Sequence, residues 1–225
     1  VPLPKCQEII TVRPRLQLLS QDTIARIVAE AYDLLSDPGV RVHSVRALSL
    51  LAGHGAQVDF QAQLARIPAD LARRAVESVS RSFHLYDAEG QPAVHYGGDD
   101  VHFDPGSAAI EILDYGAEHS RAPLIADFVR FAKLADGLGA LNATSTALVC
   151  KDVPQEIADL YRLYLALRFS RKPIVTGAFA VQTWHVMKDM LVAVAGGGQA
   201  LAEKAICGFV VWPFAAVLLA ESTCG

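Results

Sequence analysis

The 225-residue sequence has few cysteines, and none of them lies at a spacing typical of a metal site or a disulfide framework. The four cysteines are far apart and no two form a Cys-x-x-Cys pair, which favours reduced thiols over a secreted disulfide scaffold. The seven histidines show neither a His-x-x-x-His spacing nor a cysteine partner at ligand spacing. We therefore expect a cytoplasmic protein with no zinc site.

The chain also lacks a large net charge of either sign. Lys and Arg number 20 and Asp and Glu number 24, so the net charge of -4 gives no electrostatic reason to expect a nucleic-acid partner. The longest uncharged run, 205–220, is interrupted by Pro213 and is shorter than the ~17–25 residues that span a bilayer. The opening residues lack the basic-then-apolar order of a signal peptide. The sequence contains neither a Gly-x-Ser-x-Gly motif nor a Walker loop, so it gives no support for a serine hydrolase or a nucleotide-triphosphate-binding protein.

Apolar residues, in contrast, are abundant at 52%, and they gather in segments that alternate between strand and helix patterns. Segments 141–149, 173–178 and 206–211 are nearly continuous apolar runs, with a helical pattern from Pro154 to Phe169 between the first two. Strands buried on both faces and joined by helices predict a parallel sheet. Because no Gly-x-Gly-x-x-Gly opens any of these helices, the pattern favours a β/α barrel over a doubly wound dinucleotide-binding sheet.

The first half of the chain has a different pattern. A helix capped by Ser20 or Asp22, a second helix starting near Ser44 and a third starting at Pro68 are expected. They precede a period-two segment, 83–96, whose turn at 87–90 predicts a β-hairpin. We expect residues 1–105 to form an N-terminal helical plus β-hairpin region, and residues 106–225 to form the first part of a (β/α) barrel. A closed barrel takes about 250 residues of its own, so this one is expected to be truncated.

Several short motifs, in this order and spacing, resemble the trimethylamine/glycine betaine corrinoid methyltransferase family. They are Gly39-Val40-x-Val42, Gly55-Ala56-x-Val58-Asp59, Ala65-Arg66-Ile67-Pro68, Phe103-x-Pro105-Gly106, Asp114-Tyr115-Gly116, Arg121-Ala122-Pro123, Leu134-Ala135-Asp136, Asp152-Val153-Pro154 and Lys172-Pro173-Ile174. The resemblance covers about two-thirds of the chain and implies an α/β fold, a partial (β/α)8 TIM-type barrel. It also implies a role in methanogenesis or one-carbon metabolism. Family members are considerably longer, and the position that is pyrrolysine in some of them would lie beyond Gly225.

The resemblance further implies that a methyl group moves from a methylated amine, such as trimethylamine or a betaine-like quaternary amine, to a partner corrinoid protein. The cobalamin would be carried by that partner, and this chain would bind no cofactor directly. On its own the 225-residue chain is expected to show no turnover. The alternative is a truncated, non-catalytic binding or assembly fragment, in which a second copy or a partner covers the open sheet edge and makes a homo-oligomer.

A methylated amine is a compact cation, which aromatic faces and a carboxylate can hold. Phe179 and Trp212 follow two predicted strands, and Asp152 follows a third, so we predict that these three bind substrate; the catalytic residues remain unknown. The alternatives are that both aromatics pack at the barrel end and that Asp152 caps the helix beginning at Pro154.

Two further features have structural interpretations. Asp114 and Arg121 flank a tight turn and are expected to pair with each other or with the backbone. Cys150 ends the central strand and is expected to be a buried, inert thiol, although a different barrel enzyme using Cys150 or Lys151 is a third reading.

Overall fold

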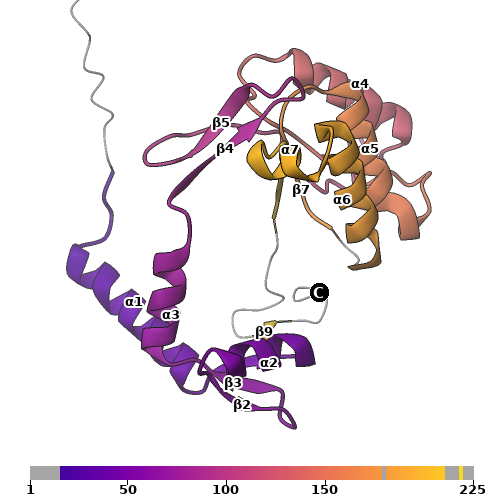
Figure 1. The fold of residues 1–225 in the computed structure, drawn as a ribbon. Coiled ribbons are helices and arrows are strands. Elements are labelled where there is room, and N and C mark those ends of the chain that lie inside the picture. The colour runs from indigo at the N-terminus through magenta and orange to yellow at the C-terminus, as the bar shows by residue number, and fades with distance from the viewer. Residues whose placement is uncertain (1–15, 179–180, 211–217, 220–225) are drawn as a thin grey trace, which may run out of the picture.

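The computed structural model describes residues 16–178, 181–210 and 218–219, and Figure 1 shows an N-terminal unit and a C-terminal α/β unit on either side of a β-hairpin. The N-terminal unit contains α1 (Gln21–Ser36), β1 (Val40–Val42), α2 (Val45–Gly53), β2 (Gln57–Asp59), β3 (Leu64–Arg66) and α3 (Ala69–Ser78). The hairpin is β4 (Ser82–Tyr86) and β5 (Pro92–Gly97). The remaining elements are α4 (Ile125–Gly137), β6 (Thr144–Ser145), η1 (Gln155–Ile157), α5 (Ala158–Phe169), β7 (Ile174–Thr176), α6 (Val181–Ala195), α7 (Gly198–Glu203), β8 (Cys207–Phe209) and β9 (Leu218–Leu219).

Local sequence signals set the starts of the first two helices. The Ser20 hydroxyl accepts a hydrogen bond from the backbone N–H of Thr23 at 3.2 Å, and the Ser44 hydroxyl accepts one from Ala47 at 3.3 Å. Each serine thus satisfies a backbone donor that the first turn of the helix leaves unpaired. Both helix starts predicted from the sequence are confirmed.

A small sheet of order β2-β3-β1-β9 forms the base of the N-terminal unit. Its core is made of Val40, Val42, Leu48 and Ala65. Leu35 of α1 packs against this core, but most of the apolar stripe of α1 lies outside it, because no residue of the helix is fully buried and Ile27 is 52% exposed. Periodicity therefore located the helix correctly but did not indicate what covers its apolar face.

The three strands β6, β7 and β8 form a parallel sheet in that order, with Thr144 beside Ile174 and Ile174 beside Cys207. This confirms the parallel pairing predicted for the three apolar runs, although each strand is shorter than its run. Segment 103–109 lies next to β6, since the Phe103 carbonyl accepts from the Asn142 N–H at 2.9 Å and Ala109 pairs in parallel with Leu148.

The two faces of the parallel sheet are covered differently. Helices α4, α5 and α6 contribute Phe128, Leu163 and Met187 to one apolar cluster that also contains Ile174. The opposite face contacts the β4–β5 hairpin through a cluster in which Val175 packs with Leu85 and Val94. All three long helices thus lie on one side. The fold is mixed α/β with small sheets, none of which closes into a barrel within the described residues.

Candidate functional site

The carboxyl ends of the parallel strands meet at one edge of the C-terminal unit. The strands end at Ser145, Thr176 and Phe209, and the loop after β6 carries Asp152, which the sequence singled out. In parallel α/β sheets ligands bind at this edge, because the loops after successive strands converge there. We therefore take this edge, called here the carboxyl rim, as the candidate site.

The hairpin covers the other end of the strands. Its Tyr86 N–H donates to the Ala205 carbonyl at 2.8 Å, and its Ala88 N–H donates to the Arg171 carbonyl at 2.8 Å. Both carbonyls precede a strand of the sheet, so the hairpin closes the amino-terminal end. Within the described residues the hairpin therefore covers the end of the sheet opposite the carboxyl rim.

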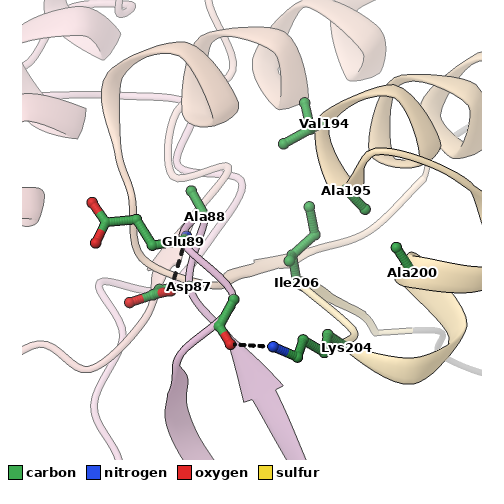
Figure 2. Close-up of a pocket in the computed structure, with 9 residues that line it drawn as sticks. Asp87, Ala88, Glu89, Val194, Ala195, Ala200, Lys204 and Ile206 are labelled. Carbon is green, nitrogen blue, oxygen red and sulfur yellow. Dashed lines mark hydrogen bonds between the residues drawn. The ribbon is translucent and has the colours of Figure 1, made fainter.

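A cavity of about 250 Å³ lies at this amino-terminal end and is lined by the hairpin turn and by α6, α7 and Ile206 (Figure 2). Lys204 crosses it to donate to the Gly90 carbonyl at 3.0 Å, while Val194 and Ala195 form an apolar wall. The cavity is thus a packing gap under the hairpin turn, at the end of the sheet away from the carboxyl rim.

Small side chains line the sheet face next to the hairpin. Ser145, Val175 and Gly208 occupy equivalent register positions, and a Cβ on Gly208 would lie 3.7 Å from the Leu85 side chain. Further along, a Cβ on Gly177 would lie 3.3 Å from the Val210 carbonyl oxygen. This face of the sheet is therefore formed by short side chains and backbone.

Asp152 lies at the carboxyl rim, but it caps a different helix from the one considered in the sequence. Its two carboxylate oxygens accept from the backbone N–H of Ile125, at 3.0 and 3.3 Å, at the start of α4. Pro154 begins η1 with no side-chain cap, so the alternative that Asp152 caps this helix is wrong. The carboxylate remains exposed to solvent at the rim.

The loop after segment 103–109 is anchored to α4 by an ion network around Arg121. Its guanidinium binds Asp114 at 2.6 and 3.0 Å and Asp127 at 2.8 and 3.0 Å. Asp127 also accepts from the Leu124 N–H at 2.8 Å, which caps α4. The Arg121 hydrogen bonds hold the pKa of the Asp127 carboxyl well below its usual range. The predicted pairing of Asp114 with Arg121 is confirmed, and its role is to fix a rim loop.

The other two predicted substrate residues, Phe179 and Trp212, lie outside the described residues. Among the described aromatic residues, Trp184 of α6 contacts Phe209 of β8 edge-on, with ring centroids 4.6 Å apart. Phe209 belongs to the helix-covered cluster, so this aromatic pair packs the outside of the sheet.

Cys150 is buried in the cluster beneath the rim, and burial raises the pKa of its thiol to about 11. Such a thiol is almost fully protonated at neutral pH and is a poor nucleophile. This supports the expected inert thiol and weakens the reading in which Cys150 performs catalysis.

Comparisons with known proteins identify the family of the chain. The family model for trimethylamine methyltransferase (MTTB) matches residues 3–212, nearly the whole chain. The chain belongs to the trimethylamine methyltransferase family.

Three curated relatives show how similar the chain is to known proteins and how much of each protein it covers. The chain is 21% identical over 194 residues to a trimethylamine methyltransferase of Desulfitobacterium hafniense, covering 86% of this chain and 39% of that protein. It is 22% identical to a glycine betaine methyltransferase of another strain of the same species, covering 86% of this chain and 40% of that protein. It is also 22% identical to a trimethylamine methyltransferase of Methanosarcina mazei, covering 93% and 43%. The chain therefore spans about two-fifths of the length of these relatives.

Two of the sequence motifs that resemble the trimethylamine methyltransferase family have a structural role in this chain. Asp114-Tyr115-Gly116 and Arg121-Ala122-Pro123 are the two ends of the loop that the Arg121 ion network closes. The loops after segment 103–109 and after β6 also meet, because the Lys151 N–H donates to the Pro123 carbonyl at 2.9 Å. These motifs thus build the rim of the candidate site.

Sequence reasoning missed a buried polar cluster behind the rim. Arg162 of α5 donates to the Thr146 carbonyl at 3.1 Å and to Asp159 at 3.0 Å, and Thr183 of α6 also contacts Asp159. All four residues are buried. The three-residue spacing of Asp159 and Arg162 on one helix indicates an ion pair, but only the packing of α5 against β6 shows that it fixes the end of a strand.

Proposed function

We propose that this chain is the first part of a methyltransferase that moves a methyl group from trimethylamine or a betaine-like quaternary amine to a corrinoid protein. The observation that carries the proposal is the family match over residues 3–212. The named activities of the relatives, toward trimethylamine and glycine betaine, supply the substrate class.

In this proposal the parallel strands are the first units of a (β/α)8 barrel. Segment 103–109, β6, β7 and β8 lie side by side in chain order, and α4, α5 and α6 cover one face only. A doubly wound sheet reverses its strand order and carries helices on both faces, whereas a barrel does neither. The arrangement therefore supports a barrel whose interior is the face lined by Ser145, Val175 and Gly208.

The corrinoid, carried by the partner protein, would supply the electron pair that forms the new bond to the methyl carbon. The amine nitrogen would keep the electron pair of the broken carbon–nitrogen bond. This chain would hold the cation and exclude water from it, because transfer requires the methyl group to be aligned with its acceptor. The exposed Asp152 carboxylate, which accepts a hydrogen bond from the Ile125 N–H, would supply negative charge at the rim. Phe179 and Trp212 would each add a cation–π contact of about 0.5–2 kcal/mol.

The test uses the complete gene product that contains these residues. Incubated with a reduced corrinoid protein and trimethylamine or glycine betaine, it should release dimethylamine or dimethylglycine, measured by NMR. Omitting the corrinoid protein should abolish product, which separates corrinoid dependence from other demethylation. A complete gene product that leaves a panel of methylated amines unchanged would contradict the proposal. The 225-residue chain alone should show no turnover.

A non-catalytic assembly fragment is the second candidate, and the position of β8 supports it. Within the described residues β8 is the last strand of its sheet, so one of its edges is open to another strand. Sedimentation of the 225-residue chain should then show concentration-dependent self-association. Two results together would exclude this candidate: a 225-residue chain that remains monomeric, and a complete gene product that demethylates an amine.

A further inference from the structure

The outer face of the β4–β5 hairpin brings together one histidine from each of its two strands. His84 and His95 are direct cross-strand partners, and their ring centroids lie 4.6 Å apart. On the opposite face of the same strands, Leu85 and Val94 are buried against the parallel sheet. The hairpin is thus fixed on its inner face, while its outer face presents two imidazoles to solvent.

The separation of the two rings suits a shared metal ion. Two imidazoles that bind one ion in adjacent positions, at about 2.0 Å each, place their ring centroids roughly 4.5–5 Å apart. The observed 4.6 Å falls within this range. His84 is exposed, so its ring can turn toward an ion without disturbing the core.

Asp100 supplies the support that a metal-binding histidine usually has. Its Oδ2 lies 2.6 Å from His95 Nδ1, in a loop just after β5. A carboxylate at Nδ1 holds the proton on that nitrogen and leaves the Nε2 lone pair for a ligand. His102 braces the same residue, because its Nε2 lies 2.9 Å from the His95 carbonyl oxygen.

Gly97 provides room for the His95 ring. A Cβ at this position would lie 3.2 Å from His95 Cε1 and 2.4 Å from the Ser82 Cβ. Any larger residue would therefore push against both the imidazole and the neighbouring strand.

We propose that His84 and His95 form a binding site for a divalent transition-metal ion, with Asp100 orienting His95. No set of three or more metal-ligating side chains comes together in the described part of the chain, so water would complete the coordination. Two imidazoles in adjacent positions suit copper(II) and nickel(II), which N-ligand sites also bind more tightly than most other first-row divalent ions. The site is independent of the methyl-transfer proposal.

The experiment titrates copper(II) or nickel(II) alone into the 225-residue chain at neutral pH and follows binding by calorimetry. We expect one ion per chain, with affinity at least about tenfold lower in His84→Ala and in His95→Ala, and about tenfold lower in Asp100→Asn. His54→Ala, at an exposed histidine that ends α2, is the matched control and should bind as the wild type does.

A thermal-unfolding scan gives a second readout. An ion that binds the folded hairpin raises the midpoint of wild-type unfolding, and this rise should disappear in His84→Phe, which keeps an aromatic ring at the position. If neither ion binds, or if binding is unchanged in both His84→Ala and His95→Ala, the proposal is overturned.

Discussion

Arg121 binds Asp127 through both of its terminal nitrogens, with Nη1 2.8 Å from Oδ2 and Nη2 3.0 Å from Oδ1. The same guanidinium reaches Asp114 through Nε at 2.6 Å. One side chain thus ties the rim loop to the first turn of α4, and two bidentate pairs give it a fixed orientation that a lysine could not reproduce.

The Asp127 ion pair should make stability depend on acid pH. The pKa of Asp127 is lowered in the folded protein, mainly by the Arg121 hydrogen bond, so the folded state binds fewer protons than the unfolded state. The stabilisation is fully present above about pH 4 and is lost as the pH falls toward the folded pKa. The free energy of unfolding in urea, compared at neutral pH and at about pH 3, should change less in Asp127→Asn than in the wild type. Glu118→Gln, at an exposed loop carboxyl, should keep the wild-type dependence; an equal loss in both variants would contradict the assignment.

Gly39 should be intolerant of a side chain. Its φ is +91°, and a Cβ would lie 2.6 Å from the Ala65 carbonyl oxygen on the neighbouring strand β3. Gly39→Ala should therefore lower the free energy of unfolding by about 2 kcal/mol or more, through strain and a disturbed β1–β3 pairing. Gly53→Ala is the control, because that glycine lies in α2 with open space around its Cα; it should be neutral or stabilising by about 0.5–1 kcal/mol. Similar losses in the two variants, measured by urea denaturation, would refute this reading.

Arg162 should be important for stability because it is buried with Asp159. Arg162→Met leaves the Asp159 carboxylate buried without this ion pair and should cost about 3–5 kcal/mol. The double variant Asp159→Leu/Arg162→Met should recover part of that loss, since it removes both charges together. Arg168→Met, at an exposed arginine on the same helix, should change stability little. A double variant less stable than Arg162→Met would show that the buried pair itself holds α5 in place.

The Cys150 thiol should resist alkylation in the folded chain. Burial raises its pKa to about 11, so the reactive thiolate is scarce at neutral pH. Iodoacetamide followed by mass spectrometry should modify Cys150 slowly in buffer and rapidly in urea. Ser49→Cys, which places a thiol at an exposed position of α2, should be modified rapidly in both conditions. Rapid modification of Cys150 in the folded protein would revive the thiol-based reading.

Asp152→Asn separates the structural and binding roles of this residue. The amide oxygen can still accept from the Ile125 N–H, so the free energy of unfolding should fall by less than about 1 kcal/mol. The negative charge is lost, however, so the KM of the complete gene product for a quaternary amine should rise several-fold while its stability is retained. An unchanged KM would restrict Asp152 to capping α4.

The helices of the described chain show how far sequence patterns reach. Ser20 and Ser44 predicted two helix starts correctly, because a cap acts on a backbone N–H only three residues away. One alternative for Asp152 was that it caps the nearby helix at Pro154, yet its carboxylate binds the N–H of Ile125, 27 residues earlier. A rule based on neighbouring residues could not predict this hydrogen bond, because the bond depends on how α4 packs against the loop after β6.

The hairpin gives a second example. Period-two alternation predicted both strands, and the register that follows from their turn places His84 opposite His95. Counting only helical ligand spacings missed this pair. No helix among the described residues is long and apolar enough to cross a bilayer.

The sequence by itself determined the helix starts, the hairpin and the parallel character of three apolar segments, because caps and hydrophobic periodicity act between residues close along the chain. Only the tertiary structure decided which helix Asp152 caps, that Arg162 is buried against the end of β6, and that most of the stripe of α1 lies outside the core. These contacts join elements tens of residues apart, and their free energy depends on the packing of whole elements rather than on any local pattern.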